Sequence, residues 1–215
     1  MGKVMIIGGH GKIALLLAPL LKAAGWEVSG MIRNAAQIDD VAAAGATPVV
    51  HDVVSSSVEE LAGLLAGQDA VIWSAGAGGG NPDRTYAVDR DAAIRSMDAA
   101  EQAGVGRYIM VSYLGARTDH GVGPGDSFFA YAEAKAAADL HLRSSGLAWT
   151  ILGPGALTLD APTGTIATDT DAAHRNTSRA NVALVAAAVL ERPDTVGRTI
   201  EFTDGNVRVA QALNP

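Results

Sequence analysis

Tyr131 and Lys135 are the two residues whose types and spacing most clearly suggest chemistry. They lie in Phe128-Phe-Ala-Tyr131-Ala-Glu-Ala-Lys135, a helix-like stretch in which residues four apart share one face. A free tyrosine titrates at about 10, so it is a poor acid or base at neutral pH. An ammonium group about 5 Å away would favour the phenolate by roughly 3 kcal/mol, or about two pKa units. We therefore expect Tyr131 to transfer a proton, and Lys135 to lower its pKa and to reach the hydroxyls of a ribose.

A glycine-rich loop follows the first apolar run of the chain. The residues Gly8-Gly9-His10-Gly11-Lys12-Ile13-Ala14 come directly after Val4 to Ile7 and open a helix-like stretch. Glycines at such a place let the backbone approach a pyrophosphate, and the helix N-terminus offers free N–H groups to it. The loop predicts a dinucleotide site. A strand–helix turn that is merely rich in glycine is the alternative.

Arg33 stands where the second predicted strand ends and bears on the choice of cofactor. A carboxylate at this place favours a ribose with a free 2′-hydroxyl, whereas an arginine accommodates a 2′-phosphate. Asn34 follows, and no acidic residue occurs before Asp39, while Lys12 could add a second positive charge. The pattern favours NADP over NAD, which stays possible. A solvated arginine at a strand end is the alternative.

Ser112 is a further candidate, because it follows a predicted strand over 108–111 and could orient a substrate carbonyl. A polar residue that simply ends a strand is the alternative. Asp169, Asp171 and His174 could touch a substrate, although a solvated loop is the favoured explanation for them. The five histidines show no paired metal-ligand spacing, so no metal site is expected.

The elements that must position these residues alternate between short apolar runs and longer helical patterns. Near-continuous apolar runs are typical of strands that are covered on both faces. Such alternation predicts a single Rossmann-type α/β domain, a doubly wound parallel sheet with helices on both faces. The predicted strands are 4–7, 28–32, 47–50, 70–73, 108–111, 149–152 and 198–202. The predicted helices are 12–24, 35–44, 58–65, 83–103, 128–145 and 178–190. Residues 76–82 and 153–175 break the rhythm after strands, and 153–175 with the C-terminal tail is expected to form a small cover over the substrate.

Composition excludes several classes of protein. The chain of 215 residues has no cysteine and a formal net charge of −7, which argues against disulfide scaffolds, thiolate chemistry and nucleic-acid binding. The apolar stretch 13–21 could imitate a signal peptide, but glycines and polar residues interrupt it, and no stretch is long enough to span a membrane. We expect a cytoplasmic protein, monomeric or homodimeric, that acts on a small molecule and binds neither nucleic acid nor membrane.

Taken in order, these motifs resemble those of the short-chain dehydrogenase/reductase superfamily. Within it the chain is similar to the compact atypical branch of NAD(P)H-binding, NAD-dependent epimerase/dehydratase-like proteins. Segments over almost the whole chain carry the resemblance: Val88-Asp89, Ala103-Gly104-Val105, Tyr108 to Ser112, Ile151 to Gly155 and Ser178 to Val182. The tyrosine–lysine pair is the most specific of them.

The resemblance implies roles for individual residues. The loop residues Gly8, Gly9, His10, Gly11, Lys12 and Ile13 would hold the pyrophosphate. Arg33 would bind the 2′-phosphate, and Asp52 and Val53 would flank the adenine. Ser74, Ala75 and Gly76 would pass beneath the cofactor, and Pro154, Gly155 and Leu157 would back the nicotinamide. Ser112, Tyr131 and Lys135 would be the catalytic residues, with Lys135 also holding the nicotinamide ribose.

Three residues depart from the pattern of the family. Ala14 replaces the usual last glycine of the loop, Asp89 occupies the place of a proton-relay asparagine, and Gly153 replaces an arginine. The chain is thus expected to be an NADP(H)-dependent oxidoreductase that transfers hydride to or from a small carbonyl or alcohol. A non-catalytic NAD(P) sensor, and a flavin or quinone reductase on the same scaffold, are the alternatives.

Overall fold

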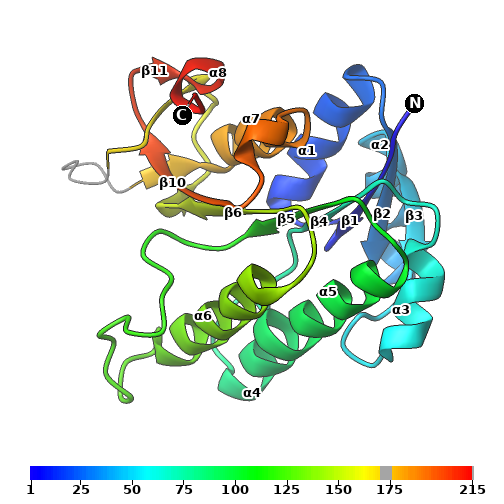
Figure 1. Ribbon diagram of the computed structural model, residues 1–215, viewed down its shortest axis with the longest axis horizontal. Coiled ribbons are helices and arrows are strands. Elements are labelled where there is room, and N and C mark those ends of the chain that lie inside the picture. The colour runs from blue at the N-terminus through cyan, green and yellow to red at the C-terminus, as the bar shows by residue number, and fades with distance from the viewer. Residues whose placement is uncertain (170–175, 215) are drawn as a thin grey trace.

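Parallel strands form the centre of the molecule, which we describe from a computed structural model over residues 1–169 and 176–214 (Figure 1). The strands that run parallel are β3 (Thr47–Val50), β2 (Glu27–Ile32), β1 (Lys3–Ile7), β4 (Ala70–Trp73), β5 (Arg107–Val111), β6 (Trp149–Pro154) and β10 (Arg198–Asp204), given in their order across the sheet. The strand order reverses between β1 and β4. This α/β sheet is the Rossmann-type fold that the sequence predicted.

The apolar strands are buried on both faces, as their continuous hydrophobicity requires. In β1, Val4 and Ile6 pack into the core on one side of the sheet, whereas Met5 and Ile7 pack into the core on the other. Successive side chains of a strand point to opposite faces, so a strand between two layers of helices needs apolar residues at every position.

Helices cover both faces of the sheet (Figure 1). On one face, α1 (Lys12–Ala23) packs beside α7 (Arg179–Leu190). On the other lie α3 (Val58–Leu65), α5 (Ala93–Gln102) and α6 (Phe129–Ser144). The short helices η1 (Ala35–Gln37) and α2 (Ile38–Ala43) precede β3, and η3 (Pro193–Thr195) precedes β10.

The helix predicted over 83–103 is a composite of three segments. It consists of α4 (Pro82–Thr85), a π-helical segment η2 (Tyr86–Ala92), and α5. A π-helical turn holds one more residue than an α-helical turn, and such segments are frequent at functional sites. Here the segment contains Asp89, whose side chain is 1% exposed.

The stretch 153–175 contains more regular structure than its sequence indicated. Strand β7 (Ala156–Thr158) pairs with β9 (Asn176–Ser178), and β8 (Thr165–Ala167) extends the main sheet as an antiparallel neighbour of β10. Strand β11 (Val207–Arg208) pairs with β8, and α8 (Val209–Ala212) follows it. Residues 170–175, with the candidates Asp171 and His174, lie outside the described residues. Among the described residues, no helix is sufficiently long and apolar to cross a membrane.

Gly9 provides a test of how closely the glycine loop packs on the sheet. A Cβ atom at Gly9 would lie 2.7 Å from the Cα of Gly30 in β2. We expect Gly9→Ala to lower the free energy of unfolding by roughly 1–3 kcal/mol, because backbone atoms would have to move apart. Urea titration measures this change.

Gly63→Ala is the matched control, since nothing lies within 4 Å of the added Cβ in α3. It should leave stability unchanged or raise it by up to about 1 kcal/mol, because alanine favours helix. Equal stabilities of the two variants would contradict the proposed close approach.

Candidate functional site

Two cavities lie along the carboxyl edge of the parallel sheet. The first, of about 260 Å³, is lined by residues at the ends of β1, β2, β3 and β4. The second, of about 460 Å³, is lined by residues at the ends of β5 and β6 and by the start of α6. Open α/β sheets bind ligands at this edge, beside the point where the strand order reverses. Both cavities therefore stand where the fold places a ligand.

The glycine loop forms one side of the first cavity through Gly8, His10 and Gly11. Gly8 has φ +88°, and a Cβ there would lie 2.7 Å from the backbone of Ala75. Gly11 is the N-cap of α1 and has no side-chain cap, so no side chain stands over the helix N-terminus there. The loop thus leaves backbone N–H groups open to an anion.

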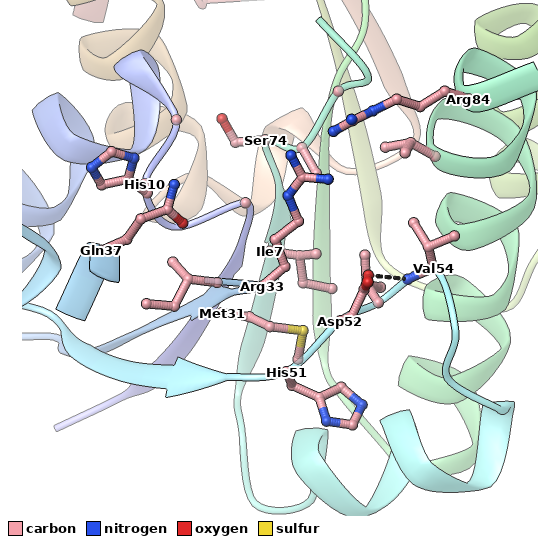
Figure 2. A pocket seen from close by; sticks show the side chains of 17 residues that line it. Ile7, His10, Met31, Arg33, Gln37, His51, Asp52, Val54, Ser74 and Arg84 are labelled. Carbon is pink, nitrogen blue, oxygen red and sulfur yellow. Dashed lines mark hydrogen bonds between the residues drawn. The ribbon is translucent and has the colours of Figure 1, made fainter. Parts of the chain in front are cut away.

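Arginine side chains supply positive charge to the same cavity. Arg33 follows β2 and Arg84 belongs to α4, and both line the cavity (Figure 2). Neither forms an ion pair with a carboxylate of the described residues. Two guanidinium groups that form no ion pair with the described residues lie in one cavity, and they favour an anionic ligand.

The first cavity brings together most of the residues that the sequence assigned to the cofactor. Asp52 and Val53 line it beside the end of β3, and the Asp52 carboxylate accepts the Val54 N–H at 3.0 Å. Ser74, Ala75 and Gly76 line it after β4. His10 lines it as well, and its Nε2 lies 2.8 Å from Asp40 Oδ2.

Three predicted loop residues lie outside this lining. The Gly9 N–H donates to Met31 O at 2.8 Å, so Gly9 secures the loop to β2. Ile13 is 7% exposed and belongs to the core below α1, and Lys12 is exposed. Their places follow from the helical geometry of α1, which turns Ile13 towards the sheet and Lys12 away from it.

The second cavity joins Ser112, Tyr131, Pro154, Gly155 and Leu157. These residues come from the end of β5, from α6, from the end of β6 and from β7, so the fold brings together segments that are far apart in the sequence. The lining also includes Tyr113, Leu114, Phe128, Ala156 and Arg179, which sequence analysis did not single out. Two hydroxyl-bearing residues, Ser112 and Tyr131, therefore line a largely apolar cavity.

Three ionisable groups are buried next to the second cavity. Lys135 and Asp139 lie on α6 and Asp89 lies in η2, with exposed fractions of 1%, 0% and 1%. Burial raises the pKa of both carboxyls and the Lys135 ammonium lowers it in part. Burial lowers the pKa of Lys135, and the carboxylates of Asp139 and Asp89 raise it in part. The three groups form one electrostatic unit.

This unit holds the neighbouring backbone and the site itself. Lys135 Nζ donates to Val111 O at 2.8 Å, at the end of β5. Asp89 accepts the Ala77 N–H at 3.0 Å after β4, and Asp139 accepts the Ser112 hydroxyl at 2.6 Å. Buried charges of this kind persist because each is paired or hydrogen-bonded.

The expected lowering of the Tyr131 pKa was wrong. Burial raises the pKa of Tyr131 above its ordinary value, and the charges of Asp89 and Asp139 and the neighbouring Tyr113 raise it further. The spacing of Tyr131 and Lys135 indicated only the lysine, whereas the carboxylates of Asp89 and Asp139 also act on the Tyr131 phenol. The Tyr131 phenol accordingly keeps its proton at neutral pH.

Lys135 also differs from its expected position. It lines neither cavity, and its ammonium contacts Val111 O and, at 3.1 Å, the Met110 sulfur. Tyr131 and Lys135 do share a helix face, but one turn further along α6 that face is covered by β5. The ammonium is therefore buried beneath the edge of the sheet, and its contact with a ribose stays a prediction.

The structure accounts for two departures from the family pattern. A Cβ at Gly153 would lie 3.1 Å from Glu201 Cγ and 3.2 Å from Tyr113 O, so an arginine there would require these neighbours to shift. Glu201 occupies this place and accepts the Gly115 N–H at 2.8 Å. At position 89, a buried carboxylate takes the place of the asparagine amide, and this carboxylate interacts electrostatically with Lys135.

Comparison with known proteins assigns the chain to a family. The sequence model of the NAD(P)H-binding family matches residues 8–193. The chain belongs to this family. A Bacillus subtilis (strain 168) protein, YhfK, described as an uncharacterized sugar epimerase, is 36% identical over 213 residues, which cover 98% of both chains.

Solved structures agree with the family and the fold. A structure from Bacillus halodurans, provisionally named an NAD-dependent epimerase/dehydratase, has a TM-score of 0.90 and 32% identity and covers 99% of each chain. The oxidoreductase ylbE from Lactococcus lactis has a TM-score of 0.86 and 28% identity, covering 98% of this chain and 94% of its own. The resemblance to NAD(P)H-binding, epimerase/dehydratase-like proteins is thus supported.

The buried ion group yields a prediction about stability and pH. Lys135→Met removes the cation and leaves Asp89 and Asp139 together, so we expect a loss of roughly 3–5 kcal/mol in the free energy of unfolding at pH 8. The folded-state pKa of each carboxyl is already raised, so folding favours its protonated form. The destabilisation should therefore diminish as the pH falls towards about 5.

Urea unfolding of the wild type and the variant across this pH range measures the effect. Lys12→Met is the matched control, because Lys12 is exposed on α1 and forms no ion pair with the described residues. A penalty that does not change with pH would show that Lys135 acts through packing alone.

Proposed function

We propose that the protein is an NADPH-dependent reductase of a small carbonyl compound. The observation that carries the proposal is the alignment of two cavities along one sheet edge, the first lined by a glycine loop and two arginines, the second by Ser112 and Tyr131. A dinucleotide that lies across the edge from β2 towards β5 brings its reactive ring to the second cavity. The names of the relatives, an epimerase, an epimerase/dehydratase and an oxidoreductase, support an enzymatic role.

The residues of the first cavity fit a phosphorylated dinucleotide. Gly8 and Gly11 line the cavity beside the N-terminus of α1, which has no side-chain cap, so its first N–H groups could bind a pyrophosphate. Arg33 stands at the end of β2, where a guanidinium can form paired bonds with a 2′-phosphate, and Arg84 adds a second charge. NADPH, when bound, would supply the hydride. The residues of this chain would then bind the substrate carbonyl and provide its proton.

Tyr131 is the proposed proton donor. Its raised pKa keeps the phenol protonated at neutral pH, which is the form that can donate a proton to a developing alkoxide. Tyr131 and Ser112 line the same cavity, so both hydroxyls can face one substrate oxygen.

The role of Ser112 depends on the proton between it and Asp139. The two oxygens lie 2.6 Å apart, close enough to share one hydrogen. When Asp139 is ionised, Ser112 donates to it and offers only lone pairs to the cavity. When Asp139 is protonated, it donates to Ser112, whose own hydrogen is then free for the carbonyl. Burial raises the pKa of Asp139, and the Lys135 ammonium and the Ser112 hydrogen bond act against that rise.

Arg33→Gln tests the choice of cofactor. Loss of one charge-assisted contact to a 2′-phosphate costs about 1.5–3 kcal/mol, so the affinity for NADPH should fall by roughly 10- to 100-fold. The affinity for NADH should stay within about twofold, since NADH lacks that phosphate. Fluorescence titration of each nucleotide measures both values.

The control is Arg143→Gln, an exposed residue near the end of α6 that lines neither cavity. Equal weakening of NADPH and NADH by Arg33→Gln would overturn the assignment of the 2′-phosphate to this residue.

Tyr131→Phe tests the proton donor. We expect carbonyl turnover to fall at least 100-fold with NADPH affinity unchanged, because the variant keeps the ring and loses only the hydroxyl. The measurement is NADPH oxidation across a panel of aldehydes and ketones between about pH 6 and 9.

The other possibilities give different results in the same assay. A flavin reductase would keep most of its activity in Tyr131→Phe, since hydride transfer to a flavin needs no phenol. A sensor would bind NADPH and turn over none of the substrates. Either result would replace the proposed reaction.

A further inference from the structure

The second cavity combines a wall of aromatic rings with a positively charged side chain. Rings of Tyr113, Phe128 and Tyr131 form a compact cluster with centroids 5.1 Å, 5.3 Å and 5.5 Å apart. Phe128 is 41% exposed, although it is a large apolar residue at the start of α6. Clustered rings with an open apolar surface favour a ligand that carries a ring of its own.

Arg179 is the charged residue in the lining that the structure describes. It begins α7, and its Nη1 donates to the carbonyls of Leu157 and Thr158 at 3.1 Å and 2.8 Å. These two bonds hold the guanidinium against β7, which forms part of the same cavity. The described residues give no partner to Nε or Nη2, so the fixed guanidinium keeps donors for a ligand.

The described lining is poorly suited to a sugar. It contains no carboxylate and no side-chain amide, the groups that would accept hydrogen bonds from several sugar hydroxyls. Its polar side chains are Ser112, the two tyrosines and Arg179. A ligand with one ring, one oxygen to be reduced and one negative group would use all of them.

We propose that the second cavity takes an aromatic carbonyl compound bearing a carboxylate or similar anionic group. This inference rests on the proposed function. The ring would pack on the wall of Tyr113, Phe128 and Tyr131, and the anionic group would bind Arg179. The carbonyl oxygen would then lie at Ser112 and Tyr131, where the proposed reaction needs it. Arg179 is thus the residue that selects the charge of the substrate.

Direct binding tests this without requiring turnover. Isothermal titration of the full-length protein, with and without NADPH, compares 2-naphthoate with 2-naphthamide, which match in shape and differ in charge. We expect naphthoate to bind at least 10-fold more tightly. Equal affinities, or no binding of either probe, would overturn the proposal.

Substitutions of Arg179 distinguish an effect of its charge on binding from an effect on folding. Arg179→Gln should abolish the preference for naphthoate and leave naphthamide within about threefold, whereas Arg179→Lys should keep part of the preference. Arg208→Gln, an exposed arginine outside the lining, is the control and should change neither. Preserved preference in Arg179→Gln would assign the anion to another residue and contradict the inference.

The aromatic wall gives a second, independent variant. Phe128→Ala changes a partly exposed side chain and should weaken both probes by a similar factor of about five or more. Unchanged affinity for both probes would show that the aromatic wall does not contact the ligand.

Turnover of 4-carboxybenzaldehyde and methyl 4-formylbenzoate tests the proposed reaction separately from binding. If the protein binds the charged probe selectively but oxidises no NADPH with either aldehyde, the proposed reductase activity is rejected and the proposed ligand class is kept.

Discussion

The buried ammonium of Lys135 is the electrostatic constraint on which the reactive end of the sheet depends. It lies among the carboxyls of Asp89 and Asp139, which come from η2 and α6. Each carboxyl in turn holds a part of the edge, Asp89 through the Ala77 N–H and Asp139 through the Ser112 hydroxyl. One cation thereby fixes the segments after β4 and β5, at the boundary between the two cavities. Because burial of a charge brings little net stability, we infer that the main effect of this ammonium is on the geometry of the edge.

Much of the fold could be predicted from the sequence because burial on both faces imposes a simple pattern. The strands β1 to β6 and β10 were found from apolar runs, and the main helices from longer periodic stretches, with errors of one or two residues at their ends. The short strands β7, β8, β9 and β11 were missed. They are polar or only two or three residues long, and their pairing depends on partners distant in the chain. The π-helical segment was missed because its sequence has an ordinary helical pattern.

The candidate site was predictable where it depends on strand ends and much less so where it depends on contacts across the chain. The glycine loop, Arg33 and Ser112 all follow strands, so topology alone places them at the edge. The spacing of Tyr131 and Lys135 predicted that both lie on one face of a helix. It could not predict that Tyr131 lines a cavity while Lys135 is buried. The pKa of Tyr131 was misjudged for the same reason, because the carboxyl of Asp89 reaches it from another element. Arg179 belongs to the segment Ser178 to Val182 that carried the resemblance, but the sequence indicated no role for it in a site, since only the fold brings it to the second cavity.

The two cavities are completed at different points along the chain. The residues that line the first end with Val88, whereas those of the second extend to Arg179. The loop that begins with Tyr113 is held besides by Glu201, through the Gly115 N–H. During synthesis on the ribosome, every residue that lines the first cavity has therefore emerged well before the second cavity can close. A chain that stops short of β10 would contain the lining residues of both cavities and lack Glu201, which holds the loop beside the second.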